Sequence, residues 1–394
     1  MSQADPGLVE LLQRLIRIPS VNPAFADDAR IGGERLLAEF VSDLLAKAGF
    51  RVEWVEEISG RPNVIARHGP DSPSRTILLE AHLDTQGVHG MVVPPFEGLI
   101  REGRVYGRGA CDTKGPLAAA LWSLTSSRLA AAAEQGVQVI FVGAIGEEKG
   151  NLGAEQLVER GLGADEALIL EPTECAVVRA HKGTLWYELE VIGRAAHGSA
   201  PERGVSAIGG MIHALKEIET EARQAAAARP NGVLGSPTLN IGVIRGGTAI
   251  NIVPERCVVE IDRRTVPGES TSAILESVRE GLARLKRQGL LVDWILTTIK
   301  DGPPFETSAE SRLIRRLCAA AESEGLPPRV EGAPWFSDAG PFSRTCREVA
   351  VFGPGSIRQA HTADEHIEIA ELARGSRILG EFFDQLAQEM ATRC

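Results

Sequence analysis

Three short apolar runs in the first half of the chain are each followed closely by side chains that can bind metals. The runs occupy residues 76–79, 139–142 and 167–170. The candidate ligands that follow them are His82 with Asp84, the pair Glu147 and Glu148, and Glu171. Runs of this length, apolar on both faces and separated by helical patterns, are typical of buried parallel strands. Because ligands bind outside the carboxyl ends of such strands, the three segments would deliver these side chains to one edge of a sheet.

The remaining patterns around these runs support an α/β fold. Apolar spacing predicts a further buried parallel strand at 63–66 and a strand at 349–352. It predicts helices at 8–18, 36–45, 116–127, 152–160, 308–324 and 367–391. The 394 residues exceed what one hydrophobic core usually organises, so two domains are expected. Residues 1–180 and 301–394 would form the first, with a mainly parallel sheet flanked by helices.

Residues 181–300 follow a different order and are expected to form an inserted domain. Strands are predicted at 184–191, 238–243, 257–263 and 291–299, with helices at 205–222 and 271–286. This β-α-β-β-α-β order is the split motif of ferredoxin-like α+β domains, which have an antiparallel sheet with helices on one face.

The net charge and the cysteine pattern limit the classes of partner and the cellular compartment that can be expected. A formal charge of −11 leaves no basic stripe, so neither a nucleic acid nor an anionic membrane is expected as a partner. The first six residues lack the basic and apolar regions of a secretory signal. No apolar run approaches the roughly 18 residues that a membrane span needs. The six cysteines include no C-x-x-C pair, which favours reduced thiols and argues against a zinc finger. We expect a cytoplasmic protein that acts on small solutes.

The candidate ligands have the chemistry of a dinuclear metal site. Imidazoles combined with carboxylates suit Zn²⁺ or Co²⁺. Paired catalytic ions lie about 3.5–4 Å apart and need a bridging carboxylate. Asp112 is the candidate bridge, because glycines on both sides mark a tight loop that enters a helix. His361 supplies a second imidazole, and Asp84 could fix the tautomer of His82.

Each of these residues also has an ordinary structural explanation. Adjacent acids such as Glu147 and Glu148 most often begin a solvated helix, and His361 alone would be a loop histidine. Only the combination of all these residues in one chain indicates a catalytic metal site. A dinucleotide-binding loop is excluded around Gly107 and Gly109, because no third glycine follows at the required position. A P-loop is excluded because Lys114 is followed by Gly115 and not by serine or threonine.

These residues also carry a resemblance to a known family. They lie in His82-Leu83-Asp84-Thr85, Gly107 to Gly115, Glu147-Glu148, Glu171-Pro172-Thr173, Ala195 to Ser199, Gly353-Pro354-Gly355 and Ala360-His361-Thr362. The set resembles, over essentially the whole chain, the co-catalytic zinc family that includes acetylornithine deacetylase, succinyl-diaminopimelate desuccinylase, aminoacylase and glutamate carboxypeptidase. Ala81, Gln86 and Thr113 stand where that family often has glycine, valine and methionine.

The resemblance implies a zinc-exopeptidase-like catalytic domain with an inserted lid or dimerisation domain. It also implies two divalent ions, zinc first, with cobalt or manganese as alternatives. One ion would be bound by His82, Asp112 and Glu171, and the other by Asp112, Glu148 and His361. Glu147 would be the general base for a metal-bridging hydroxide that attacks an amide carbonyl, and would return the proton to the departing amine.

Further roles follow from the same resemblance. His197 would reach the active site of a partner subunit in a homodimer and stabilise the oxyanion, so it joins Glu147 and Asp84 as a catalytic candidate. Asn251 and Arg264 would bind the substrate carboxylate, with the neighbouring Arg263 as an open alternative.

The segment near His361 would complete the substrate site. Gly353 and Gly355 would present backbone N–H groups to the same carboxylate. Asp338 would lie near the ligands without binding metal.

The expected function is hydrolysis of the amide bond of a small N-acyl amino acid, as in acetylornithine deacetylase. A dipeptidase or carboxypeptidase on the same scaffold is the alternative, and short peptides would then be substrates. A metal-free binding relative and a nucleotide-binding protein are less favoured, because every ligand and Glu147 are retained and no phosphate loop is present. Two connections between the domains suggest hinge closure over the substrate.

Overall fold

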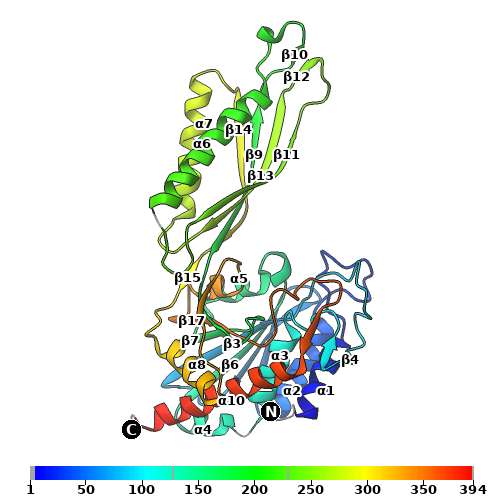
Figure 1. Ribbon diagram of the computed structural model, residues 1–394, viewed down its shortest axis with the longest axis vertical. Helices are drawn as coiled ribbons and strands as arrows, with labels where there is room; N and C mark the ends of the chain where they lie inside the picture. The colour runs from blue at the N-terminus through cyan, green and yellow to red at the C-terminus, as the bar shows by residue number, and fades with distance from the viewer. Residues whose placement is uncertain (1–4, 127, 229, 393–394) are drawn as a thin grey trace. The chain divides into compact units, whose positions relative to one another are not determined.

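The computed structural model describes residues 5–126, 128–228 and 230–392, and they form two compact units (Figure 1). Unit 1 comprises Met1–Arg179, Glu306–Glu331 and Ser337–Cys394, and unit 2 comprises Ala180–Phe305 and Gly332–Phe336. Residues 1–4, on which part of the signal-peptide argument rests, lie outside the described residues, as do Ser127, the expected end of one helix, and Cys394. The units differ from the expected boundaries at residue 180, at 301–305 and at 332–336, all of which belong to unit 2. In the last of these segments Ala333 O accepts the backbone N–H of Lys182.

Unit 1 is built on a mixed nine-stranded sheet with the order β1-β2-β6-β3-β7-β17-β8-β15, and β16 also pairs with β8. Its strands are β1 (Arg51–Ile58), β2 (Arg61–His68), β3 (Arg75–His82), β6 (Val137–Ala144), β7 (Glu166–Ile169), β8 (Val177–His181), β15 (Phe305–Glu306), β16 (Val330–Ala333) and β17 (Glu348–Val351). The four central strands, β6, β3, β7 and β17, are parallel. The continuous apolar runs predicted this direction for β3, β6 and β7.

Residues 63–66 form a strand as predicted, but the predicted parallel direction is wrong. They belong to β2, which runs antiparallel to both β1 and β6. Only residues 59 and 60 separate β1 from β2, and Gly60 takes a positive φ of 81°. A connection this short joins antiparallel strands, whereas a parallel pair needs a crossover of about a dozen residues or more. The edge of the sheet is therefore a hairpin.

The main core of unit 1 lies on one face of this sheet. Side chains alternate along β3, so Ile77, Leu79 and Ala81 pack into that core while Glu80 and His82 belong to the opposite face. The helices of the unit are α1 (Pro6–Ile16), α2 (Arg35–Lys47), α3 (Lys114–Leu124), α4 (Arg128–Glu134), α5 (Leu152–Glu159), α8 (Arg312–Ser323), α9 (Ala339–Phe342) and α10 (Ile369–Ala391). A small sheet orders β18 (His366–Glu368), β5 (Arg104–Tyr106) and β4 (Leu99–Arg101).

Helix α3 fixes the position of the loop before it. Nearly every residue of α3 is buried, as expected for a helix that is apolar on all sides. It packs against α1 and α10, which come from the two ends of the chain (Figure 1). The start of α3, two residues after Asp112, is therefore held deep inside unit 1.

Unit 2 has the expected β-α-β-β-α-β order. Its antiparallel sheet is ordered β11-β13-β9-β14, and its core lies between this sheet and the two long helices. The elements are β9 (Gly183–Ile192), β10 (Ala196–His197), η2 (Pro201–Arg203), α6 (Ala207–Ala228), β11 (Thr238–Gly246), β12 (Ile252–Val253), β13 (Arg256–Thr265), α7 (Thr271–Arg287) and β14 (Asp293–Gly302). The expected α/β class with an α+β insertion is confirmed.

Within the ranges that the structure describes, no helix combines the length and the apolar character that a membrane crossing requires.

Candidate metal centre

Three neighbouring strands end at one place on the edge of the unit 1 sheet. His82 is the last residue of β3, and Glu171 follows two residues after β7. Glu147 and Glu148 begin the short 3-10 helix η1 (Glu147–Lys149) that follows β6. Since β6, β3 and β7 are adjacent and parallel, these side chains meet at the carboxyl edge. Asp112 reaches the same place from the loop before α3, and His361 from the loop before β18.

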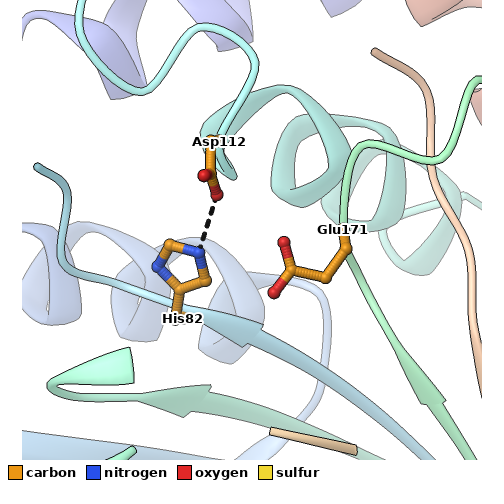
Figure 2. Close-up of side chains that lie close together, drawn as sticks. All are labelled: His82, Asp112 and Glu171. Carbon is orange, nitrogen blue, oxygen red and sulfur yellow. Dashed lines mark hydrogen bonds and ion pairs between the residues drawn. The ribbon is translucent and has the colours of Figure 1, made fainter. Parts of the chain in front are cut away.

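These residues form two groups that share Asp112. His82, Asp112 and Glu171 offer ligand atoms that all lie within 4.8 Å of one another, and so do Asp112, Glu148 and His361. Figure 2 shows the carboxylate of Glu171 directed toward His82 and Asp112. His82 Nε2 lies 3.0 Å from Asp112 Oδ1, and His361 Nε2 lies 3.2 Å from Asp112 Oδ2. Each oxygen of Asp112 thus faces a different imidazole, which is the arrangement of a carboxylate that bridges two cations.

His82 and His361 both lie against carboxylates of this centre. Burial would raise the pKa of Asp112, but hydrogen bonds to His361 and His82 hold it well below its usual range. Burial and the charge of Asp112 raise the pKa values of Glu148 and Glu171. Hydrogen bonds to Asp112 and Glu148 raise the pKa of His361 to about 10. Two divalent cations would add positive charge among these carboxylates.

The donor atoms fit such cations. Nitrogen and oxygen ligands together suit borderline metals. Glu148 Oε1 is buried and has no hydrogen-bond partner among the described residues, so it retains free acceptor capacity. The two groups differ in exposure, because His82, Asp112 and Glu171 are buried while the His361 side chain is 51% exposed. The second group is therefore the more open to solvent and small molecules.

Asp84 has a different task from the one expected. The Nδ1 atom of His82 lies 2.9 Å from the backbone carbonyl oxygen of Asp84, whereas the Asp84 carboxylate is 3.7 Å away. That carboxylate accepts the backbone N–H groups of Glu147 at 3.0 Å and Glu148 at 3.2 Å, and the side-chain amide of Asn22 at 2.7 Å. The main chain fixes the His82 tautomer, and the Asp84 side chain holds the turn that bears both glutamates.

Glu147 precedes the ligand candidate Glu148 in the same short helix. Burial, with the charges of nearby carboxylates, raises its pKa to about 8, although the neighbouring His82 lowers it. The side-chain amide of Asn151 lies 3.2 Å from Glu147 Oε1 and 2.8 Å from Asp338 Oδ1. Asp338 is fully buried in this arrangement and belongs to neither ligand group. Asn151 had no signal in the sequence beyond its place four residues after Glu147.

The loop of Asp112 is held by a residue that the sequence did not single out. Glu365 is buried and accepts backbone N–H groups from Gly109, Cys111 and Asp112, at 3.1, 3.0 and 3.0 Å. Its other partner is the buried guanidinium of Arg108, at 2.6 Å. A single carboxylate four residues after His361 therefore shapes the loop of the shared ligand.

The structure does not support the expected role of the two glycines near His361. The N–H of Gly353 donates to Thr173 Oγ1 at 3.1 Å, and the backbone of Gly355 hydrogen-bonds to Glu371, so neither amide is free for a substrate. Both positions are tightly packed. A Cβ atom on Gly353 would lie 2.6 Å from the Glu171 carbonyl oxygen, and one on Gly355 would lie 2.8 Å from Cys111 Sγ. These glycines let the loop approach the ligand segments.

The three remaining site candidates lie on unit 2. His197 is exposed, and its Nδ1 atom lies 2.7 Å from Ser199 Oγ. Strand β10, which ends at His197, pairs with β12, and Gly198 N donates to the carbonyl of the exposed Asn251 at 2.7 Å. The structure therefore brings the His197 and Asn251 loops together. Arg264, near the far end of β13, is partly exposed and pairs with Asp262 at 3.0 Å.

The open choice between the adjacent arginines is narrowed by burial. Arg263 lies on the helix-covered face of the unit 2 sheet, is 1% exposed and bonds to Glu269 at 3.0 Å. Arg264 lies on the opposite face. Of the two, only Arg264 can present its guanidinium to a solute without unfolding.

Comparisons with known proteins agree with this geometry. The model of peptidase family M20/M25/M40 matches residues 78–385. An acetylornithine deacetylase from Myxococcus xanthus is 32% identical over 355 residues, which cover 87% of this chain and 90% of that protein. An acetylornithine deacetylase from Proteus mirabilis (strain HI4320) is 29% identical and covers 96% of each chain.

Among solved structures, an M20 family metallo-carboxypeptidase from Sulfolobus solfataricus has a TM-score of 0.77 at 21% identity, covering 98% of this chain and 100% of that one. The family resemblance found in the motifs is confirmed. Together with the paired ligand groups at the sheet edge, these matches show that the chain is an amide- or peptide-hydrolysing enzyme and belongs to peptidase family M20/M25/M40.

Proposed function

We propose that this enzyme hydrolyses the amide bond of a small N-acyl amino acid, in the manner of an acetylornithine deacetylase. The observation that carries the proposal is the position of Asp112, whose two oxygens face His82 and His361 in two ligand groups, with Glu147 alongside. The two relatives described above bear the acetylornithine deacetylase name and match nearly the full chain. Zinc is the first candidate for both ions, with cobalt and manganese as alternatives.

The side chains divide the reaction between them. The bound ions would acidify a water molecule and polarise the amide carbonyl. Glu147 takes a proton from that water through a carboxylate oxygen, as the water oxygen bonds to the acyl carbon. The carbon–nitrogen bond then breaks, and Glu147 returns the proton to the amine nitrogen. Asn151 holds Glu147 Oε1 during both transfers, and Asp84 fixes the backbone of the same turn.

The residues of unit 2 are assigned to substrate recognition. We propose that Arg264 pairs with the substrate carboxylate, for which guanidinium geometry is suited, and that Asn251 assists it. His197 would stabilise the oxyanion in the site of a partner subunit within a homodimer. The exposure of His197 and Asn251, and the contact between their loops, support a shared role. The division into two compact units supports a lid domain at about 181–300 that closes over the substrate.

The reducing cytoplasm is the proposed location. The five cysteines within the described residues are all free thiols, and none forms a disulfide with another. Such usage is common in reducing compartments.

The decisive experiment is a substrate panel. Purified enzyme is incubated with acetyl-, formyl- and succinyl-amino acids and with dipeptides, in the presence of zinc, cobalt or manganese. Release of free amine from N-acyl amino acids at the highest kcat/KM supports the proposal. Faster turnover of dipeptides assigns the enzyme as a dipeptidase, and carboxypeptidase action appears as removal of C-terminal residues from longer peptides. Metal binding without turnover of any compound would favour a binding protein.

The partner-subunit role of His197 has its own test. His197→Ala and Glu147→Gln proteins, each inactive alone, are mixed, dissociated and reassociated. If His197 acts in the partner's site, mixed dimers regain one intact site and about a quarter of the total sites become active. A mixture that stays inactive although light scattering shows dimers would place both residues in one chain's site.

A further inference from the structure

Gln86 contacts one of the candidate metal ligands. Its side-chain nitrogen Nε2 donates to Glu148 Oε2 at 3.0 Å. A carboxylate can only accept, so the amide must present its nitrogen to Glu148. Gln86 is partly buried, and its side chain starts from a backbone held on both sides. Thr85 N donates to Ser20 O at 3.0 Å, and the Gly87 carbonyl accepts from Arg108 Nε at 2.9 Å.

The Gln86 contact leaves the two oxygens of Glu148 in different situations. Oε2 is held by Gln86 and lies 3.1 Å from His361 Nε2. Oε1 is buried and has no hydrogen-bond partner among the residues described. Rotation of this carboxylate about its terminal bond is otherwise soft, since such sp³–sp² torsions are broad. Gln86 therefore selects one orientation of Glu148, in which Oε2 faces His361 within the ligand group.

The residue that Gln86 contacts, Glu148, belongs to only one of the two ligand groups. Glu148 is a member of the group with Asp112 and His361, but not of the group with His82 and Glu171. Asp84, two residues before Gln86, holds the backbone N–H of Glu148 at 3.2 Å. Two side chains from one short segment thus fix both the main chain and the carboxylate of the same ligand.

We infer that Gln86 is a positioning residue that sets the metal affinity of the Asp112–Glu148–His361 site and leaves the His82–Asp112–Glu171 site unaffected. The inference rests on the two-metal part of the proposed function and is independent of which amide is hydrolysed. Hydrogen-bond partners of metal ligands typically change metal affinity by 10- to 100-fold when they are removed.

The test measures metal binding and not turnover. Cobalt is titrated into metal-free wild-type and Gln86→Met protein, and binding is followed by calorimetry and visible absorption. Methionine keeps the unbranched shape of glutamine but donates no hydrogen bond. The expected result is one site weakened by about 10- to 100-fold and one site unchanged. Gln138→Met is the matched control, because Gln138 donates a similar bond to the Pro70 carbonyl at 2.7 Å, and both affinities should stay as in the wild type.

A second set of titrations, in His361→Ala protein, shows which of the two metal sites Gln86 affects. In His361→Ala protein, which retains the complete first group, Gln86→Met should have no further effect on cobalt affinity. Equal weakening of both sites, unchanged affinities in Gln86→Met, or an effect that persists in His361→Ala would each overturn the inference. A wild-type protein that binds fewer than two ions would instead overturn the two-metal proposal itself. Thermal melts in chelator show whether each variant is folded before titration.

Discussion

Glu365 Oε1 accepts the backbone N–H of Asp112 at 3.0 Å, although the two residues are 253 positions apart in the sequence. Through this bond the segment that bears His361 also shapes the loop of the shared carboxylate. The arrangement of the ligands is therefore coupled to packing at the opposite end of the chain.

Replacing Glu365 by Gln should destabilise the protein strongly. The change leaves the buried Arg108 guanidinium without its charged partner, and breaking a buried ion pair typically costs about 3–5 kcal/mol. Urea unfolding in the presence of chelator measures the loss. Glu368→Gln is the control, since the Glu368–Arg104 pair is half exposed and exposed ion pairs contribute little to stability. Similar losses in both variants would contradict the central place given to Glu365.

Glu147→Gln should remove turnover but keep both metals. Glutamine has the same shape and can still contact Asn151, but it cannot take a proton from water. General-base catalysis usually contributes about 10²- to 10⁴-fold, so kcat should fall by that factor. Steady-state kinetics and metal analysis of the same preparation check both parts. Retained turnover at full metal content would eliminate Glu147 as the base.

The stability of metal-free protein should fall as pH rises through about 8. The pKa of Glu147 is raised from 4.5 to about 8, so between these values the folded state holds a proton that the unfolded state has released. This contribution is complete below about pH 4.5 and is lost above about pH 8, with a slope of at most ~1.4 kcal/mol per pH unit.

Glu147→Gln isolates this effect because glutamine does not titrate. In chelator, the melting temperature of the variant relative to wild type should increase from pH 6 to pH 9. A constant difference over that range would show that Glu147 does not hold the proton.

Metal removal should lower the melting temperature even when folding is complete. Each site that binds only the folded state adds about 2.7 kcal/mol at a free metal concentration of 100 times its Kd. Cations also offset the buried carboxylates around Asp112. Thermal melts during zinc titration should therefore show two stabilising steps in wild type and one in His361→Ala. A melting curve insensitive to chelator would be incompatible with two metal sites.

The central strands could be predicted from the sequence because parallel strands buried on both faces show continuous apolar runs. β3, β6 and β7 follow this rule, and the ligands after them lie at one edge as expected. The edge strand β1 was missed for the opposite reason. Half of its residues are exposed and only Val55 is buried, and a register irregularity between Val55 and Ile58 breaks the period of two.

The residues that hold the ligands could not be predicted from the sequence. Glu365, Asn151 and Gln86 act through contacts with segments that only the folded chain brings near. The sequence alone also suggested that Gly353 and Gly355 offer free amides, whereas steric demand at Glu171 and Cys111 explains why glycine is needed there.

Asp112 faces one histidine that lies 30 positions before it and another that lies 249 positions after it. During synthesis on the ribosome, a nascent chain that has not yet reached His361 can assemble only the group of His82, Asp112 and Glu171. Binding of both ions at the shared carboxylate therefore requires that the His361 segment has been synthesised and has folded against the Asp112 loop.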